Sequence, residues 1–247
     1  MPFKPARSIT TGAILLLLLC SCATQAPVGH GIPSETVFKP VAGHDQRIYL
    51  TLHLESGREL LFIVDTGAPV TLLDKSLEPD LGKCTGTYRS NYDALGIVTE
   101  VKVFHPPKLF LGGIQLLTGD QVYTDDVQSL PTGRPVMGIL GMDCLRHYCI
   151  QLDLPAGKLR FLDPAHSGIG ITGEKYPISW VNGVPWIHAN LFGDSKEAYM
   201  VDTGCPDDVD LKAKRFAAEV RRLQSEPGGE AVVLKQIRLS PRVLKHL

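Results

Sequence analysis

The chain has 247 residues and a formal net charge of −1, with 44% hydrophobic and 21% charged residues. These values are typical of a globular protein and argue against wholesale disorder. The near-neutral charge, together with the lack of a basic run interleaved with aromatic residues, argues against nucleic acid as a partner. The length allows one large domain or two small ones.

The first 21 residues have the pattern of a secretory signal and are not expected to belong to the fold. Two basic residues precede a short apolar segment at residues 13–19, which is too short to span a bilayer alone. The sequence "LCSC" at residues 19–22 resembles a bacterial lipobox, so cleavage would leave Cys22 as a lipidated N-terminus followed by a linker at residues 22–43. An ordinary signal peptide with incidental cysteines is the alternative. Both interpretations predict an exported protein, periplasmic or at the cell surface, and the first adds a lipid anchor in a membrane.

From residue 44 onward the pattern predicts many short strands separated by turns. Residues 47–54 alternate apolar and polar, which predicts a half-buried strand, and the apolar run that leads into "DTG" at residues 60–67 predicts its hairpin partner. Further strands are expected at residues 98–104, 108–111 and 122–123, a short helix at 142–147, and a hairpin of residues 149–154 with 159–163. This pattern predicts an all-β lobe over residues 44–165, built as a closed or nearly closed barrel.

The same pattern begins again at residue 176. Strand-like segments at residues 176–183 and 185–193 precede a third at 198–204, which also ends in "DTG". Asp65 and Asp202, the aspartates of the two motifs, lie 137 residues apart. The repeat predicts a second, related lobe at residues 176–247 that is shortened, with a helix at residues 211–224.

No CxxC or HExxH spacing is present, so the sequence predicts neither a metal site nor a cofactor. Four cysteines remain beyond the signal segment: Cys84, Cys144, Cys149 and Cys205. An exported chain could pair these cysteines in three ways or keep them as buried thiols.

An aspartate at the end of an apolar strand is costly to bury unless it is paired or hydrogen-bonded. Gly67 allows a sharp turn that brings backbone N–H groups to the Asp65 carboxylate, and Thr66 supplies a hydroxyl that can bond across to an equivalent loop. Two such loops would place two carboxylates close together. Because like charges at that separation cannot both ionise, they would share one proton and could act as a general acid–base pair on water and a carbonyl.

The segment "FIVDTGAPVTLLD" at residues 62–74 resembles the active-site segment of retropepsin-like aspartic peptidases. The segment "GILGMDCL" at residues 138–145 resembles the downstream signature of that family, two apolar residues and a glycine. The resemblance covers about residues 45–163 and implies a pepsin-type all-β fold. It implies that Asp65 is the catalytic acid/base acting on a peptide or protein substrate. The residues that it assigns to support of the active-site loop are Thr66, Gly67, Ala68, Ile139, Leu140 and Gly141.

Two sources of the second aspartate are open. Pepsin-like members of the family take it from a second lobe, which here would be Asp202 with Thr203 and Gly204, and retroviral members take it from the Asp65 counterpart of a partner chain in a homodimer. The second motif departs from the family because no apolar-apolar-Gly segment follows Asp202. An aspartic-type endopeptidase is therefore the leading hypothesis, and a catalytically inactive peptide-binding module of the same fold is the alternative. A flap over the substrate is expected between residues 88 and 99, with Tyr88 or Tyr92 at its tip.

Overall fold

The computed structural model describes residues 36–37, 47–90, 99–153, 156–162, 175–190, 197–205 and 221. Outside the described residues lie the predicted signal segment, Cys22, nearly all of the predicted linker, Tyr92 with the expected flap tip, and the expected C-terminal helix apart from Arg221. Arg221 itself is helical.

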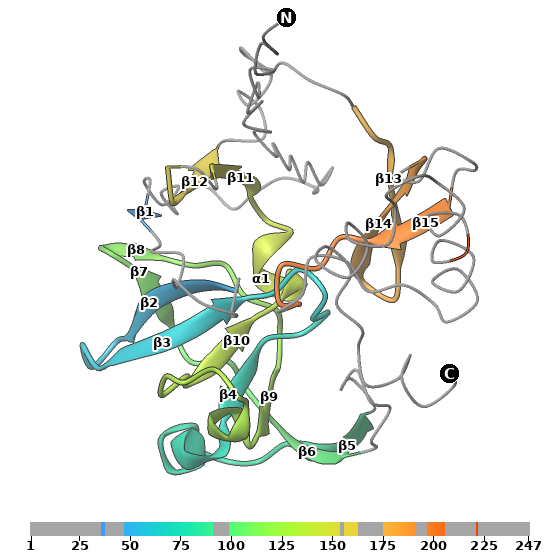
Figure 1. Cartoon of the computed structure of the whole chain (residues 1–247). Coiled ribbons are helices and arrows are strands. Elements are labelled where there is room, and N and C mark those ends of the chain that lie inside the picture. Colours follow the sequence, from blue (N-terminus) through green and yellow to red (C-terminus); the bar gives the residue numbers. More distant parts are fainter. Residues whose placement is uncertain are drawn as a thin grey trace, which may run out of the picture.

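A mixed nine-stranded sheet forms the body of the molecule (Figure 1). Its strands run in the spatial order β5-β6-β9-β4-β10-β3-β2-β7-β8. Their bounds are β2 Ile48–Leu54, β3 Glu59–Val64, β4 Leu72–Asp74, β5 Gly86–Ser90, β6 Thr99–Phe104, β7 Leu109–Leu111, β8 Ile114–Gln115, β9 Val122–Asp125 and β10 Gly138–Leu140. The expected hairpin of β2 with β3 and the expected strands near residues 98–104, 108–111 and 122–123 are confirmed. The expected closed barrel is not found, because no ladder joins β5 to β8 among the described residues.

Strand β10 occupies the centre of this sheet although it was not expected as a strand. It pairs in parallel with β3, with Leu140 opposite Val64, and antiparallel with β4. The segment between β4 and β10 contains the 3₁₀ helices η1 (Lys75–Asp80) and η2 (Val127–Ser129). The short helix α1 (Met142–Leu145) follows β10 directly, so the predicted helix at 142–147 is confirmed with an earlier end. Because β3 carries Asp65 at its end, β10 brings its own last residues to the same edge of the sheet.

Strands β2 and β3 carry buried side chains on both faces, although alternation at residues 47–54 predicted burial of only one face of β2. Leu50, Leu52 and Phe62 belong to the larger apolar cluster, which also contains α1, while Tyr49 and Ile63 belong to a second cluster on the opposite face. Tyr49 is 5% exposed and carries the guanidinium group of Arg134 at 5.0 Å from its ring centre. The strand pair that leads to Asp65 is therefore held between two apolar clusters, which gives its end a fixed position.

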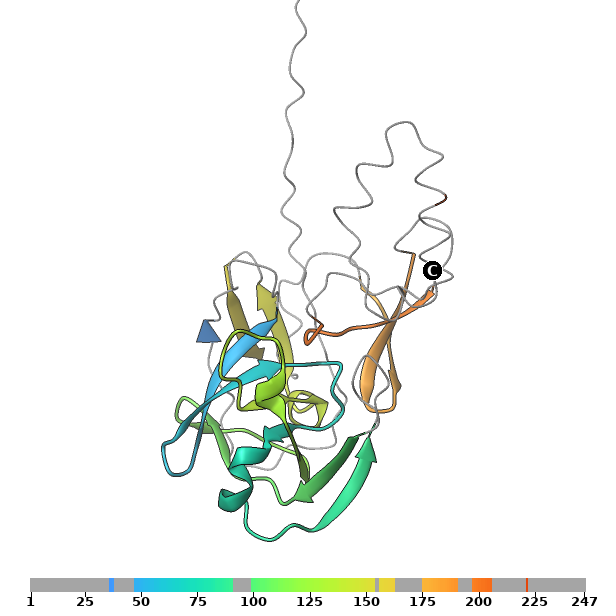
Figure 2. The ribbon, with the colours of Figure 1, turned by 60° about the horizontal axis from the view of Figure 1, so that its bottom comes forward.

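Two smaller sheets complete the described fold. Strands β1 (Thr36–Val37), β12 (Lys158–Leu162) and β11 (Cys149–Asp153) form one, in the order β1-β12-β11, and include the predicted hairpin near residues 149–163. Strands β13 (Ile178–Val181), β14 (Val184–Ala189) and β15 (Glu197–Met200) form the other, which lies apart from the main sheet in both views (Figures 1 and 2). After β15 the chain runs back to the main sheet beside α1, drawn in orange.

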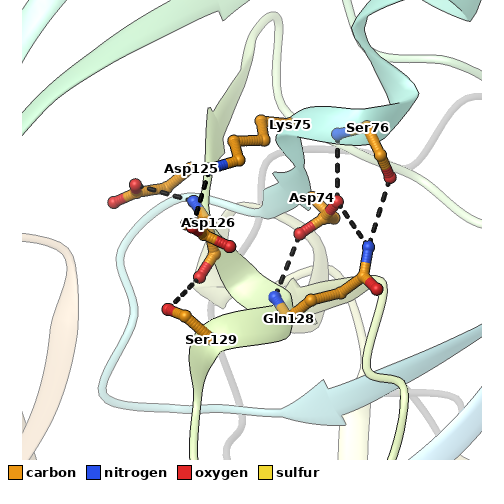
Figure 3. Close-up of polar contacts among 7 residues, drawn as sticks. All are labelled: Asp74, Lys75, Ser76, Asp125, Asp126, Gln128 and Ser129. Carbon is orange, nitrogen blue, oxygen red and sulfur yellow. Dashed lines mark hydrogen bonds and ion pairs between the residues drawn. The ribbon is translucent and has the colours of Figure 1, made fainter.

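Asp74, at the end of β4, links three elements through its buried carboxylate (Figure 3). Oδ1 accepts the backbone N–H of Ser76 at 2.9 Å and caps η1, and it also accepts the Gln128 side-chain amide at 2.8 Å. Oδ2 accepts the backbone N–H of Gln128 at 3.0 Å, which ties η2 to the same strand. Because both oxygens are hydrogen-bonded, this carboxylate stabilises the fold in its ionised form.

Cys84 is an exposed free thiol, and Cys144 is a buried one. Burial raises the pKa of the Cys144 thiol well above its ordinary value, which makes it an inert core side chain. None of the described helices is long and apolar enough to cross a membrane.

Candidate active site

Asp65 begins a tight loop at the end of β3. Its Oδ1 accepts the backbone N–H groups of Gly67 at 2.7 Å and Ala68 at 3.1 Å, and its own N–H donates to the carbonyl of Leu140 at 3.0 Å. The carboxylate thus turns back over the loop that follows it, and its other oxygen is left for contacts outside the loop. The burial expected to be costly is offset by these N–H donors.

The segment that follows β10 is hydrogen-bonded to this loop. Met142 donates its N–H to the Ala68 carbonyl at 2.8 Å, and the Gly141 N–H donates to the Thr71 hydroxyl at 3.2 Å. A Cβ on Gly141 would lie 2.7 Å from the carbonyl carbon of Val70 and 2.9 Å from the Ala68 oxygen. The backbones approach too closely there for any side chain, so a glycine is required at this position.

The second motif, at residues 202–205, repeats the geometry of the first. Oδ1 of Asp202 accepts the N–H groups of Gly204 at 2.9 Å and Cys205 at 3.0 Å. The spacing of donors and acceptor is the same as around Asp65, which the shared Asp-Thr-Gly sequence explains. The residues that follow Cys205 lie outside the described part of the chain.

Two threonines join the loops by reciprocal hydrogen bonds. The Thr66 hydroxyl donates to the Val201 carbonyl at 2.6 Å and accepts the N–H of Thr203 at 3.1 Å. In return, the Thr203 hydroxyl donates to the Val64 carbonyl at 2.8 Å and accepts the N–H of Thr66 at 3.1 Å. Each hydroxyl therefore uses its donor and one acceptor site on the other loop, so the two loops hold each other in a fixed relative position.

This arrangement brings the two carboxyl groups together within one chain. A Cβ on Gly67 would lie 2.6 Å from Cγ of Asp202, and a Cβ on Gly204 would lie 2.2 Å from Cγ of Asp65. Each glycine thus lies directly against the other loop's aspartate, which only a residue without a side chain permits. We call Asp65 and Asp202 the dyad.

The electrostatics of the dyad follow from this proximity. Burial, the negative charge of Asp202 and a hydrogen bond between the two carboxyl groups raise the pKa of Asp65 from 3.8 to about 7, against the opposing effect of the Gly67 and Ala68 N–H groups. A carboxyl group with this pKa keeps its proton over the acid-to-neutral range, which allows Asp65 to act as a general acid.

Arg47, which precedes β2, also contacts the second loop, and sequence reasoning missed it. Its Nε donates to the Gly204 carbonyl at 3.0 Å across 157 residues of sequence. A single arginine at the start of a predicted strand carries no signal for such a long-range contact.

Asp143, in the first turn of α1, lies close to the Asp65 loop and donates its N–H to the Pro69 carbonyl at 3.2 Å. Its Oδ1 accepts the Thr71 hydroxyl at 2.7 Å, and its Oδ2 is buried with no hydrogen-bond partner among the described residues. Burial raises the pKa of Asp143 despite its hydrogen bond from Thr71. The side chain therefore belongs to the network beneath the Asp65 loop.

The expected flap corresponds to the β5–β6 hairpin, whose tip lies outside the described residues. Tyr88 on β5 is 53% exposed and stacks on Tyr123, with ring centres 5.7 Å apart. Within the part of the chain that the structure describes, no group of three or more His, Cys, Asp or Glu side chains is arranged to hold a metal ion.

Two comparisons with known proteins found similarities. The chain is 24% identical over 147 residues, or 55% of its length, to the retrovirus-related Pol polyprotein from transposon 412 of Drosophila melanogaster. It spans about a tenth of that polyprotein, 11% of its length. No family model matches the chain.

Among solved structures, the chain is similar to a retropepsin-like aspartic protease from Rickettsia conorii. The similarity has 16% sequence identity and a TM-score of 0.38, and covers 56% of this chain and 96% of that one.

Proposed function

We propose that this chain is an aspartic-type endopeptidase whose two catalytic aspartates, Asp65 and Asp202, come from the same chain. The observation that carries the proposal is the reciprocal hydrogen bonding of Thr66 and Thr203, which holds the two carboxyl groups against each other. The Pol polyprotein similarity supports the same class of enzyme. Both motifs of one chain take part in these hydrogen bonds, which favours Asp202 over the Asp65 of a partner chain as the second aspartate.

The dyad would act on a peptide bond with one shared proton. The ionised carboxylate takes a proton from a water molecule as the water oxygen attacks the peptide carbonyl carbon, and the protonated carboxyl donates its proton to the carbonyl oxygen. The tetrahedral intermediate then collapses: one of its hydroxyl groups returns a proton to the ionised carboxylate, the other carboxyl group gives its proton to the nitrogen, and the C–N bond breaks, which leaves the dyad with one proton again. No metal or covalent enzyme intermediate enters this reaction.

Activity should fall as the pH rises through about 7, where Asp65 loses its proton and no acid remains in the dyad. The test is cleavage of an unfolded protein by the mature chain between pH 3 and 8, with products identified by mass spectrometry. We expect internal cleavage by the parent chain and none by Asp65→Asn. If the parent binds peptide without cleaving it, the chain is a peptide-binding module of the same fold; the absence of an apolar-apolar-Gly segment after Asp202 favours this second candidate.

We further propose that the protein is exported and lipid-anchored in a bacterial membrane through Cys22. The proposal rests on the signal-like residues 1–21 and on the lipobox-like "LCSC" sequence. Metabolic labelling with a fatty acid should label the parent chain, and Cys22→Ala should remove both the label and the membrane association. Export without labelling of the parent would indicate an ordinary signal peptide.

A further inference from the structure

The two DTG loops bind their carboxylates in nearly the same way. In the first loop, Oδ1 of Asp65 accepts N–H groups at 2.7 and 3.1 Å, and in the second, Oδ1 of Asp202 accepts them at 2.9 and 3.0 Å. The loops alone therefore give no reason for one aspartate to be charged and the other neutral. A difference between them has to come from groups outside the loops.

Arg47 is a charged group that contacts the second loop. Its Nε lies 3.0 Å from the Gly204 carbonyl oxygen in a partly buried position. An arginine side chain keeps its positive charge throughout the pH range in which proteins are folded. Partial burial also means that water and salt screen this charge less than they would at the surface.

The peptide group between Gly204 and Cys205 links the arginine to Asp202. Its carbonyl oxygen accepts from Arg47, and its N–H donates to Oδ1 of Asp202 at 3.0 Å. A cation at the oxygen end polarises the peptide group and makes its N–H a stronger donor. Because a stronger hydrogen bond to the carboxylate favours its charged form, the arginine acts on Asp202 through this peptide group.

We propose that Arg47 is a positioning residue that selects Asp202 as the ionised member of the dyad and leaves the shared proton on Asp65. The assignment of roles in the reaction rests on the proposed function: Asp202 would take the proton from water, and Asp65 would protonate the carbonyl oxygen. The distribution of charge itself requires no cleavage and can be measured separately.

Two charged groups contact the second loop in the described part of the chain. Asp65 forms a hydrogen bond with Asp202, and Arg47 donates to the Gly204 carbonyl. Burial and the negative charge of Asp202 both raise the pKa of Asp65. The aspartates at positions 207, 208 and 210 lie outside the described residues.

The direct test is a pH titration of the intact mature chain with ¹³C-labelled aspartate carboxyl groups, followed by NMR from pH 3 to 9. Asp65→Asn and Asp202→Asn serve to assign the two signals. We expect the Asp202 signal to follow the lower titration step and the Asp65 signal the upper one. The opposite order overturns the proposal, and this result does not depend on any arginine variant folding.

Arg47→Gln removes the charge from the Gly204 carbonyl. The lower titration step should move up by about 0.5 to 1 pH unit, and the acid limb of kcat/KM should move with it while the alkaline limb stays nearly unchanged. Arg47→Lys keeps the charge and should restore most of the difference. The matched control is Arg58→Gln, which removes the same charge from an exposed ion pair with Asp80 and should move neither limb.

The outcomes separate this proposal from the proposed function. A uniform loss of kcat at every pH, with the titration steps of Arg47→Gln unmoved, would show a merely structural role for Arg47 and overturn the proposal. If the parent chain cleaves nothing but Asp202 still titrates first and responds to Arg47→Gln, the charge assignment stands and the peptidase function fails.

Discussion

Replacing Asp65 with asparagine should stabilise the protein at neutral and alkaline pH while it abolishes cleavage. Asparagine keeps the shape of the side chain and an oxygen that can accept the Gly67 and Ala68 N–H groups. It removes the ionisation that burial and the neighbouring Asp202 make unfavourable. The residue that we propose as catalytic is therefore also a residue that destabilises the fold once it is ionised.

The size and pH window of this effect follow from the pKa of Asp65. The folded chain raises this pKa from 3.8 to about 7, so between these values the folded state binds more protons than the unfolded state, and stability falls as the pH rises. A pKa rise of about 3 corresponds to a destabilisation of the folded state by at most about 4 kcal/mol above pH 7. Taking half of this bound, because the proton is shared with Asp202, gives about 2 kcal/mol, or a Tm increase of about 4 to 8 °C.

The assay is thermal unfolding of the parent and Asp65→Asn at pH 3, 5.5 and 8. We expect equal Tm values at pH 3 and the largest gain at pH 8. The control, Asp80→Asn, removes an exposed carboxylate whose side chain is 54% exposed and should stay within about 0.5 kcal/mol of the parent at every pH. A lower Tm for Asp65→Asn at pH 8, or a gain that does not depend on pH, would refute the electrostatic reasoning.

Three further changes test the fold around the site. Thr66→Val should cost about 2 to 4 kcal/mol, because it leaves groups of the other loop without partners, and the double variant with Thr203→Val should cost less than the sum of the two, as chemical denaturation would measure. Asp74→Asn should cost about 1 to 2 kcal/mol at pH 7 and less as the pH falls toward 3. Burial raises the pKa of Asp74, but its hydrogen bonds lower this pKa overall. The stabilisation by the ionised carboxylate is therefore present at neutral pH and lost in acid. Gly141→Ala should cost about 1 to 3 kcal/mol and lower kcat, since its Cβ would lie 2.7 Å from the backbone of Val70.

Each of these predictions has a result that contradicts it. Additive costs for the two threonine variants would mean that their hydrogen bonds do not act as one unit. A cost for the Asp74 variant that is the same at pH 3 and pH 7 would show that its charge does not contribute. Gly112→Ala is a control for the glycine, because a Cβ there would meet nothing within 4 Å although its φ of 58° adds strain of its own. An unchanged kcat in Gly141→Ala would mean that the brace beneath the loop has no influence on the site.

The sequence predicted the elements that carry strong local patterns. The alternation at residues 47–54 and the apolar run before Asp65 identified β2 and β3. The family signature singled out residues 139–141, and Leu140 and Gly141 are hydrogen-bonded to the segment that begins at Asp65. The repeated "DTG" sequence predicted that Asp202 has an environment like that of Asp65, and the hydrogen bonds of the two loops correspond. These features were accessible because each depends on a few consecutive residues.

Features that depend on distant contacts were not accessible. Strand β10 has three residues, too few for alternation to register, and it is a strand because β3 and β4 hold it on both sides. The contact between Arg47 and Gly204 joins residues 157 positions apart, and nothing near either residue signals it. A closed barrel was expected because many short strands are typical of one, yet strand number alone does not determine whether the last strand pairs with the first.

The central claim, that one chain supplies both aspartates, is tested most directly by a mixing experiment. Cleavage of an unfolded protein is measured for the parent, Asp65→Asn, Asp202→Asn and an equal mixture of the two variants, with the molecular mass in solution recorded for each. We predict that the parent is active as a monomer, that both variants are inactive, and that the mixture remains inactive. Activity of Asp202→Asn as a dimer, or restored activity in the mixture, would contradict the claim and assign the second aspartate to a partner chain.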